Sequence, residues 1–165
     1  MKKYLLLSLI LMLCATLCMG CGSLPPGSGT VGDKPVGTPS KPFEGEVDNY
    51  PGVKLVVVEG TVTPTSAEVK IVNESGYGMS CMGDNYIRVQ KEVDGAWYDL
   101  SFHNEPVNSL GPRQFDADHE YHETVKWERF YEALSTGHYR IVKDCSVRTD
   151  SDRISLLLTA EFELK

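Results

Sequence analysis

The C-terminal part of the chain alternates between apolar and polar positions. Six apolar residues spaced two apart fall on one face: Ile154, Leu156, Leu158, Ala160, Phe162 and Leu164. Because successive side chains of a strand point to opposite faces, this spacing predicts one long strand with a single buried face. Shorter apolar or alternating stretches predict six more strands, at residues 53–59, 66–73, 85–93, 96–100, 121–127 and 138–145. The helical turn that we expect lies near residues 128–134.

About seven short strands separated by frequent turn residues are typical of an aligned β-sandwich. Leu134, Gly137 and Tyr139 also match L-x-x-G-x-Y, the pattern of a tyrosine corner. In such a corner the Tyr hydroxyl bonds to the backbone just upstream; the alternative is that Tyr139 is an ordinary strand aromatic. The sequence therefore predicts an all-β domain over residues 53–165, an immunoglobulin-like β-sandwich with these three residues as a structural site.

The first 20 residues follow a different pattern. Two lysines at positions 2 and 3 precede an apolar run of 16 residues, which ends in the sequence C-M-G-C at residues 18–21. The run is short for a membrane span, which needs about 20 residues. A positive start, an apolar middle and a small-residue exit indicate a secretory signal. Its end resembles the lipobox of bacterial lipoproteins, although Cys18 stands where Leu is usual; an ordinary cleaved signal is the alternative.

The resemblance to a lipobox implies that residues 1–20 are a lipoprotein signal peptide and that Cys21 is lipidated. The partner would then be the membrane, reached through a diacylglyceryl anchor at the extracellular face of the cell membrane. One acyl chain binds only marginally, whereas two give stable attachment. Residues 22–52 contain seven Gly and six Pro and few apolar residues, so they cannot bury a core. We therefore expect residues 21–52 to be a lipid-anchored flexible linker.

Several short motifs then follow one another in a set order. They are a strand ending in Asn73, a glycine-led strand from Gly83, a turn before Trp97-Tyr98, G-x-Y-R at residues 137–140 and A-E-F at residues 160–162. This order resembles the bacterial immunoglobulin-like domain family found in Gram-positive surface lipoproteins. The resemblance implies the fold and an extracellular location. It implies no activity, since none is established for the family.

In the fold that this resemblance implies, the strands next to Cys81 and Cys145 are the antiparallel neighbours C and F. The two cysteines would then lie at the same pole, and an extracellular compartment permits a bond between them. We predict a Cys81–Cys145 disulfide; two free thiols, or a metal or redox role, are the alternatives. Since Cys14 and Cys18 would leave with the signal and Cys21 would carry lipid, this pairing accounts for all five cysteines.

Charge and motifs restrict the chemistry. A net charge of −7 argues against general nucleic-acid binding, which needs a basic face. The sequence lacks H-E-x-x-H and G-x-S-x-G, so we expect no catalytic residue, no enzyme activity and no cofactor. Asp116, Asp118 and Glu120 are weak candidates for a cation site, because oxygen ligands suit calcium. The same charges fit better as a strand edge that resists aggregation.

Aromatic side chains are the better binding candidates. Trp97 and Tyr98 are adjacent and should face opposite sides of a strand, and Tyr77 lies between two glycines in a loop. Exposed aromatics can anchor an interface, although Trp97 could instead fill the sandwich core. We predict a monomeric, non-catalytic binding or structural module whose partner is an envelope protein or a glycan. The alternatives are an inhibitor or regulator of an extracellular protein, and a calcium-binding or small hydrolytic module.

Overall fold

The computed structural model describes residues 39–165 except residues 84–85 and 105–110. The described strands belong to one compact unit. The predicted signal peptide, Cys21 and the first part of the predicted linker lie outside the described residues. Among the residues that are described, no helix is long and apolar enough to cross a membrane.

The described residues form ten strands and one short 3-10 helix, η1, which confirms the all-β class. In chain order they are β1 (Pro39–Pro42), β2 (Val53–Val57), β3 (Ser66–Asn73), β4 (Met79–Cys81), β5 (Arg88–Val93), β6 (Ala96–Leu100), β7 (Arg113–Phe115), β8 (His119–Lys126), η1 (Trp127–Arg129), β9 (Gly137–Arg148) and β10 (Arg153–Leu164). The predicted strands are present, and η1 begins the turn expected near residues 128–134. The strand that starts at Gly137 is longer than predicted, since it continues three residues past Cys145.

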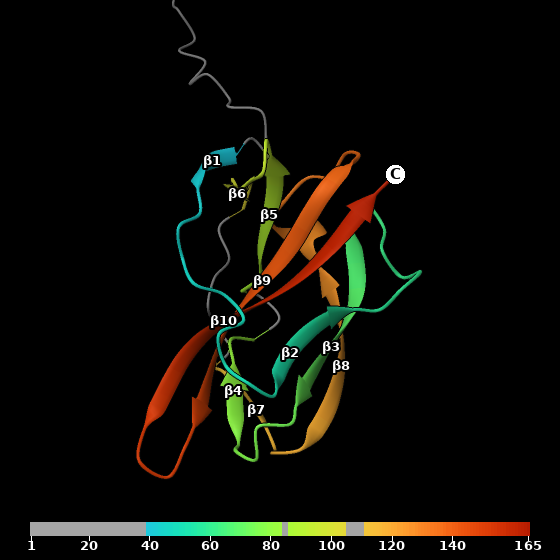
Figure 1. Ribbon diagram of the computed structural model, residues 1–165. Coiled ribbons are helices and arrows are strands. Elements are labelled where there is room, and N and C mark those ends of the chain that lie inside the picture. Colours follow the sequence, from blue (N-terminus) through green and yellow to red (C-terminus); the bar gives the residue numbers. More distant parts are fainter. Residues whose placement is uncertain (1–38, 84–85, 105–110) are drawn as a thin grey trace, which may run out of the picture. The chain divides into compact units, whose positions relative to one another are not determined.

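The strands form two sheets, as Figure 1 shows. The small sheet has the order β2-β3-β8, and the large sheet has the order β1-β6-β5-β9-β4-β7, with β10 along the other side of β9. β9 and β10 are paired antiparallel over their full 12 residues, from Gly137 opposite Leu164 to Arg148 opposite Arg153. β9 is therefore the central strand to which the rest of the large sheet is registered.

The apolar face predicted for the last strand lies in the core between the sheets. Its Leu156, Leu158, Ala160 and Phe162 are buried, facing apolar residues of β2 and β3 such as Leu55 and Val69. Ile154 departs from the prediction, because its side chain is 39% exposed. It lies near the tip of the β9–β10 hairpin, where Figure 1 shows the two strands extending away from the small sheet.

The tryptophan that fills the sandwich core is Trp127, not Trp97. Trp127 is fully buried at the end of β8; its ring lies 5.3 Å from that of Phe162, and its Nε1 donates to the Pro64 carbonyl at 2.8 Å. Trp97 lies opposite Glu92 in the β5–β6 pair and is half-buried. Alternation places Trp97 correctly on one face of its strand, but it does not say which face looks into the core.

The third strand of the sandwich is divided into two parts. β4 pairs with β9 at Cys81↔Cys145, and β5 pairs with the same side of β9 at Arg88↔Val142. Cys81 thus lies within a short strand, and Cys145 lies within β9 rather than at its end. The two cysteines form a disulfide between neighbouring strands, with their Cα atoms 3.9 Å apart and 64 residues between them in sequence. This is the cysteine pair that the sequence predicted.

The ordered domain begins earlier than residue 53. Residues 39–52 were expected to belong to the flexible linker, but β1 pairs with β6 at Pro42↔Tyr98. Further on, the Asp48 amide donates to the Leu157 carbonyl at 2.8 Å, and the Thr159 amide donates to Asp48 Oδ1 at 2.8 Å. The predicted boundary at residue 52 is therefore wrong. Composition reveals that this segment lacks a core, but it does not reveal that strand edges elsewhere hold it by hydrogen bonds.

A tyrosine corner fixes the entry into β9. The Tyr139 hydroxyl donates to the Ser135 carbonyl at 2.9 Å, and Leu134 is buried beside it in the core. Gly137 has a packing role, because a Cβ at this position would lie 3.1 Å from Lys91 Cε and from Tyr139 Cε2. The three residues of the motif thus act together to place β9.

We expect Tyr139→Phe to lower the free energy of unfolding by about 1 kcal/mol, because the Ser135 carbonyl loses its partner inside the fold. Urea denaturation measures the change. Tyr98→Phe is the matched control, since the Tyr98 hydroxyl makes no hydrogen bond to the described residues. Equal midpoints for the two variants would contradict the role of the corner.

Candidate functional site: the outer face of the large sheet

The outer face of the large sheet is the side turned away from the small sheet. Along β9, Tyr139, Ile141 and Val147 point into the core. The side chains between them, including Arg140 and Asp144, therefore point to the outer face, because direction alternates along a strand. Arg140 is a charged residue with only 6% of its surface exposed, and Gln90 beside it is fully buried. Buried polar groups away from the core distinguish this face from an ordinary solvated sheet surface.

A hydrogen-bonded row crosses three strands of this face. Arg140 Nε on β9 donates to Gln90 Oε1 on β5 at 2.6 Å, and Gln90 Nε2 donates to Asp99 Oδ1 on β6 at 2.9 Å. Burial, as the largest cause, lowers the pKa of the Arg140 guanidinium. The ordinary pKa of arginine is so far above neutrality that the group keeps its charge. The row therefore holds a charged guanidinium in a fixed orientation.

Two aromatic rings lie against this guanidinium. Arg140 Cζ is 4.4 Å from the centre of the Trp97 ring and 5.3 Å from that of the Phe43 ring. Arg88 Cζ lies 5.8 Å from the centre of the same Phe43 ring. These distances are in the range of cation–π attraction. We call the surface formed by Arg88, Arg140 and Trp97 the arginine slot; Phe43 occupies it.

A histidine joins three strands next to the arginine slot. His138 Nδ1 on β9 lies 2.5 Å from Glu92 Oε2 on β5, and His138 Nε2 lies 3.3 Å from Glu161 Oε2 on β10. The Trp97 ring lies edge-on to the His138 ring, with centres 5.2 Å apart. The two carboxylates approach different ring nitrogens, so they brace the imidazole from two sides.

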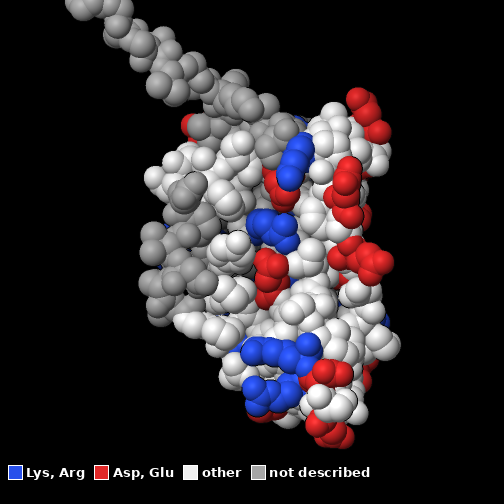
Figure 2. Space-filling view, turned by 90° about the vertical axis from the view of Figure 1, so that its left-hand side faces the viewer, with Lys and Arg blue, Asp and Glu red and all other residues white. Residues whose placement is uncertain are grey.

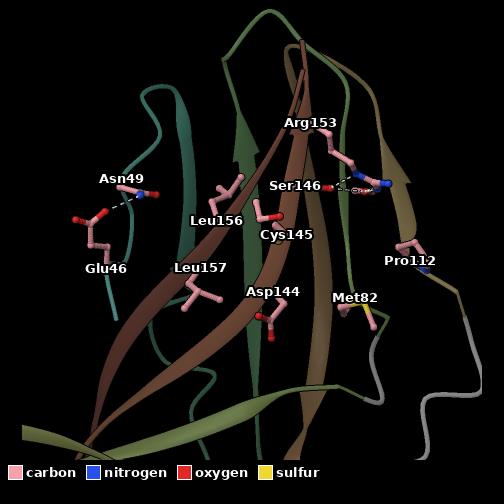
Figure 3. Close-up of a pocket in the computed structure, with 12 residues that line it drawn as sticks. Glu46, Asn49, Met82, Pro112, Asp144, Cys145, Ser146, Arg153, Leu156 and Leu157 are labelled. Carbon is pink, nitrogen blue, oxygen red and sulfur yellow. Dashed lines mark hydrogen bonds between the residues drawn. The ribbon is translucent and has the colours of Figure 1, made fainter. Parts of the chain in front are cut away.

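A shallow groove of about 490 Å³ lies further along the same face. Figure 3 shows Arg153 reaching toward Ser146, with Asp144 and Leu157 lower in the groove and Glu46 on the opposite side. Arg153 Nε donates to Ser146 Oγ and Arg153 Nη2 donates to Ser80 Oγ, both at 2.9 Å. The two hydroxyls lie 3.0 Å apart.

The described residues of this groove form a mixed polar and apolar lining, without an arrangement for nucleophilic catalysis. Within the described part of the chain, the side-chain partners of Ser80 and Ser146 are each other and Arg153, and none of these is a base that could activate a hydroxyl.

On the face that Figure 2 presents, Lys and Arg side chains lie among Asp and Glu side chains rather than in one patch of either sign.

The three aromatic residues predicted to bind lie in different surroundings. Trp97 is part of the arginine slot, whereas Tyr98 is the next residue along β6 and so faces the other side of the sheet. Tyr77 packs against the core and is half-buried. Its carbonyl accepts from Asn73 Nδ2 at 2.9 Å and from Ser75 Oγ at 3.2 Å. Tyr77 lies in a loop as the sequence predicts, but its two flanking glycines do not hold it freely in solvent.

The three carboxylates considered for a cation do not converge. Asp118 has a φ of 56° in the turn before β8, so residues 116–120 do not alternate as one strand. Asp118 Oδ1 accepts from the Gly76 amide at 3.3 Å, whereas Glu120 pairs with His122 at 2.9 Å and with Lys70 at 3.3 Å. Within the described ranges, no group of three or more His, Cys, Asp or Glu side chains could hold a metal ion.

The partners of Glu120 affect its ionisation. The hydrogen bond from His122, and then that from Lys70, lower the pKa of the Glu120 carboxyl. A carboxyl whose pKa is lower in the folded state stabilises the fold above its ordinary pKa, and this contribution is lost as the pH falls. The pair is exposed, so its contribution to stability is small.

The sequence interpretation did not identify a buried ion pair between the sheets. Lys143 Nζ on β9 lies 2.6 Å from Glu123 Oε1 on β8, and the two side chains are 1% and 7% exposed. Arg113 Nη1 lies 3.3 Å from the other oxygen of Glu123, and its side chain is 47% exposed. Alternation places Lys143 on the same inward face as Tyr139 and Ile141, but it does not identify the partner on β8, so sequence alone does not reveal the pair.

Two packed antiparallel sheets with a tyrosine corner define the class, an immunoglobulin-like β-sandwich. The sequence model of the bacterial Ig-like domain family matches residues 49–163, and the chain belongs to this family. Domains of this family are typically non-catalytic modules. No curated protein matches the chain. A crystal structure of a protein from Archaeoglobus fulgidus is 16% identical, with 68% of this chain and 95% of that chain covered and a TM-score of 0.26.

Proposed function

We propose that this protein is a bacterial lipoprotein. A diacylglyceryl group on Cys21 holds it at the extracellular face of the cell membrane, where its Ig-like domain is a non-catalytic binding module of the envelope. One observation carries the proposal: a signal that ends in a small residue and a cysteine precedes a domain of a family that is typically non-catalytic. The Gly- and Pro-rich residues 22–38 between Cys21 and β1 fit a spacer.

The outer face of the large sheet supports the binding part of this proposal. It contains an oriented guanidinium beside Trp97, which Phe43 covers in this structure. Surfaces that combine arginine with large aromatics are frequent energetic centres of protein interfaces. The groove next to it is lined by serine hydroxyls, carboxylates and Arg153. These groups can bind a partner without catalysing a reaction on it.

Replacing Cys21 tests the anchor. We expect Cys21→Ala to abolish labelling with radioactive palmitate and to remove the protein from the detergent-rich phase of a Triton X-114 separation, because the sulfur that carries the lipid is gone. Cys18→Ala is the matched control and should keep both properties, since Cys18 would leave with the signal. Palmitate labelling that persists in Cys21→Ala would show that the anchor is elsewhere or that the chain is not a lipoprotein.

A further inference from the structure

The segment from residue 39 to residue 48, which we call the strap, crosses the outer face of the large sheet. At one edge β1 pairs with β6, and at the other edge Asp48 bonds to Leu157 and Thr159 of β10. Between the two edges Phe43 lies over the arginines of β5 and β9. Figure 1 shows this course as the cyan segment that runs from β1 past β10 toward β2.

The strap is held weakly along β6. Pro39 and Pro42 have no amide hydrogen to donate, and the pairing register shifts between them. The Phe43 amide donates to the Trp97 carbonyl at 2.7 Å. The described residues on either side of Phe43 are exposed, so the strap buries little apolar surface. Segments with few buried apolar contacts open at a free energy well below that of global unfolding.

The arginine slot is fitted to an aromatic ring. The chain bends back over the Phe43 ring at Gly45, where a Cβ would lie 2.4 Å from Phe43 Cζ. The slot nevertheless contains one unsatisfied donor, because Arg88 Nε is buried and has no hydrogen-bond partner among the described residues. Phe43 fills the hydrophobic part of the slot but provides no acceptor for this donor.

We propose that the strap is an internal occupant of a peptide-docking site. When the strap lifts, the edge of β6 and the arginine slot accept an extended segment of another protein that carries an aromatic residue next to a carboxylate. This inference rests on the proposed binding function and adds to it the surface and the class of partner. It also gives Trp97 a role. Its ring forms one side of the site, and its carbonyl accepts a backbone hydrogen bond from the bound segment.

Three interactions recognise such a segment. The edge of β6, once the strap has left it, supplies backbone hydrogen bonds, which is how extended peptides add to a sheet. The guanidinium groups of Arg88 and Arg140 attract the face of an aromatic ring. The unmet Nε–H of Arg88 donates a charge-assisted hydrogen bond to the carboxylate. A basic segment would instead bring like charge against two guanidinium groups.

The test measures binding of a fluorescein-labelled peptide with the sequence of residues 39–48 to the full chain in detergent. We expect Phe43→Ala to bind this peptide at least about tenfold more tightly than the wild type, whose own strap competes for the slot. A peptide with Ala in place of Phe43 should not bind, because the ring that fills the arginine slot is gone. Phe102→Ala is the matched control, because Phe102 is exposed and contacts Tyr131 instead.

Two results would overturn the inference. One is that Phe43→Ala, with a wild-type circular dichroism spectrum and melting temperature, binds the peptide no better than the wild type. The other is that Arg88→Met in the Phe43→Ala chain leaves peptide binding intact, since the slot would then not be the site. Hydrogen exchange of the wild type should show the strap amides opening below the global unfolding free energy. None of these readouts depends on lipid at Cys21, so the anchor and the docking site are judged separately.

Discussion

Replacing Glu123 with Leu is expected to lower the free energy of unfolding by about 3–5 kcal/mol. The side chain of Lys143 is 1% exposed, and in this variant its ammonium group stays between the two sheets without a carboxylate. Removing one partner of a buried ion pair is costly because the remaining charge keeps its full desolvation penalty. Urea denaturation of the full chain, followed by circular dichroism, measures the loss.

The other partner should behave differently. In Lys143→Met, Glu123 keeps Arg113 at 3.3 Å, so this variant should lose less stability than Glu123→Leu. Combining the two replacements removes both charges and should recover much of the loss, since apolar residues of similar size fill the same space. Glu120 lies on the same strand as Glu123, and Glu120→Leu breaks its exposed pair with Lys70 of β3. This variant is the matched control, with a far smaller expected effect. If Glu123→Leu were as mild as Glu120→Leu, the pair would not be buried as described.

Removing the disulfide is the second large change. Cys81→Ala together with Cys145→Ala should lower the free energy of unfolding by about 2–5 kcal/mol, since the bond closes a long loop in the unfolded chain. Alanine is the suitable replacement because both cysteines are buried in the core cluster and a hydroxyl there would lack a partner. The native pairing of β4 with β9 should persist in the folded state, so the far-ultraviolet spectrum should not change.

A reductant provides the control for this prediction. Dithiothreitol should shift the urea midpoint of the wild type to that of the double alanine variant and leave the variant itself unchanged. A wild-type midpoint that is indifferent to reductant would mean that the thiols are free in the protein, or that the bond adds nothing to stability.

The strands could be predicted because one face of each is covered by the other sheet. Burial on one side imposes a period of two, which is visible at Val69 and Ile71 and along the last strand. The tyrosine corner was equally accessible, since its residues lie within six positions of one another and its hydrogen bond is local. Local patterns therefore account for the class of fold.

The arrangement of the outer face could not be predicted, because residues 39–52, which cover part of it, show no alternation of apolar and polar positions. Gly and Pro mark residues 39–52 as unable to form a core, yet Phe43 and Asp48 of that segment contact β5, β9 and β10. Arg140 belongs to the G-x-Y-R motif, so the sequence identifies its position. The sequence does not identify the side chains that Arg140 contacts. Burial of a polar residue by a distant segment depends on tertiary contacts, which alternation does not encode.

The division of the third strand into β4 and β5 has a consequence for how this domain tolerates change in length. Each part is registered to β9 by itself, β4 through the Cys81–Cys145 bond and β5 through Arg88 opposite Val142. Residues added to or removed from the chain that joins the two parts therefore need not shift either register. Insertions elsewhere in a strand would move every side chain to the opposite face. The junction between β4 and β5 is thus a natural point for grafting new sequence onto this scaffold.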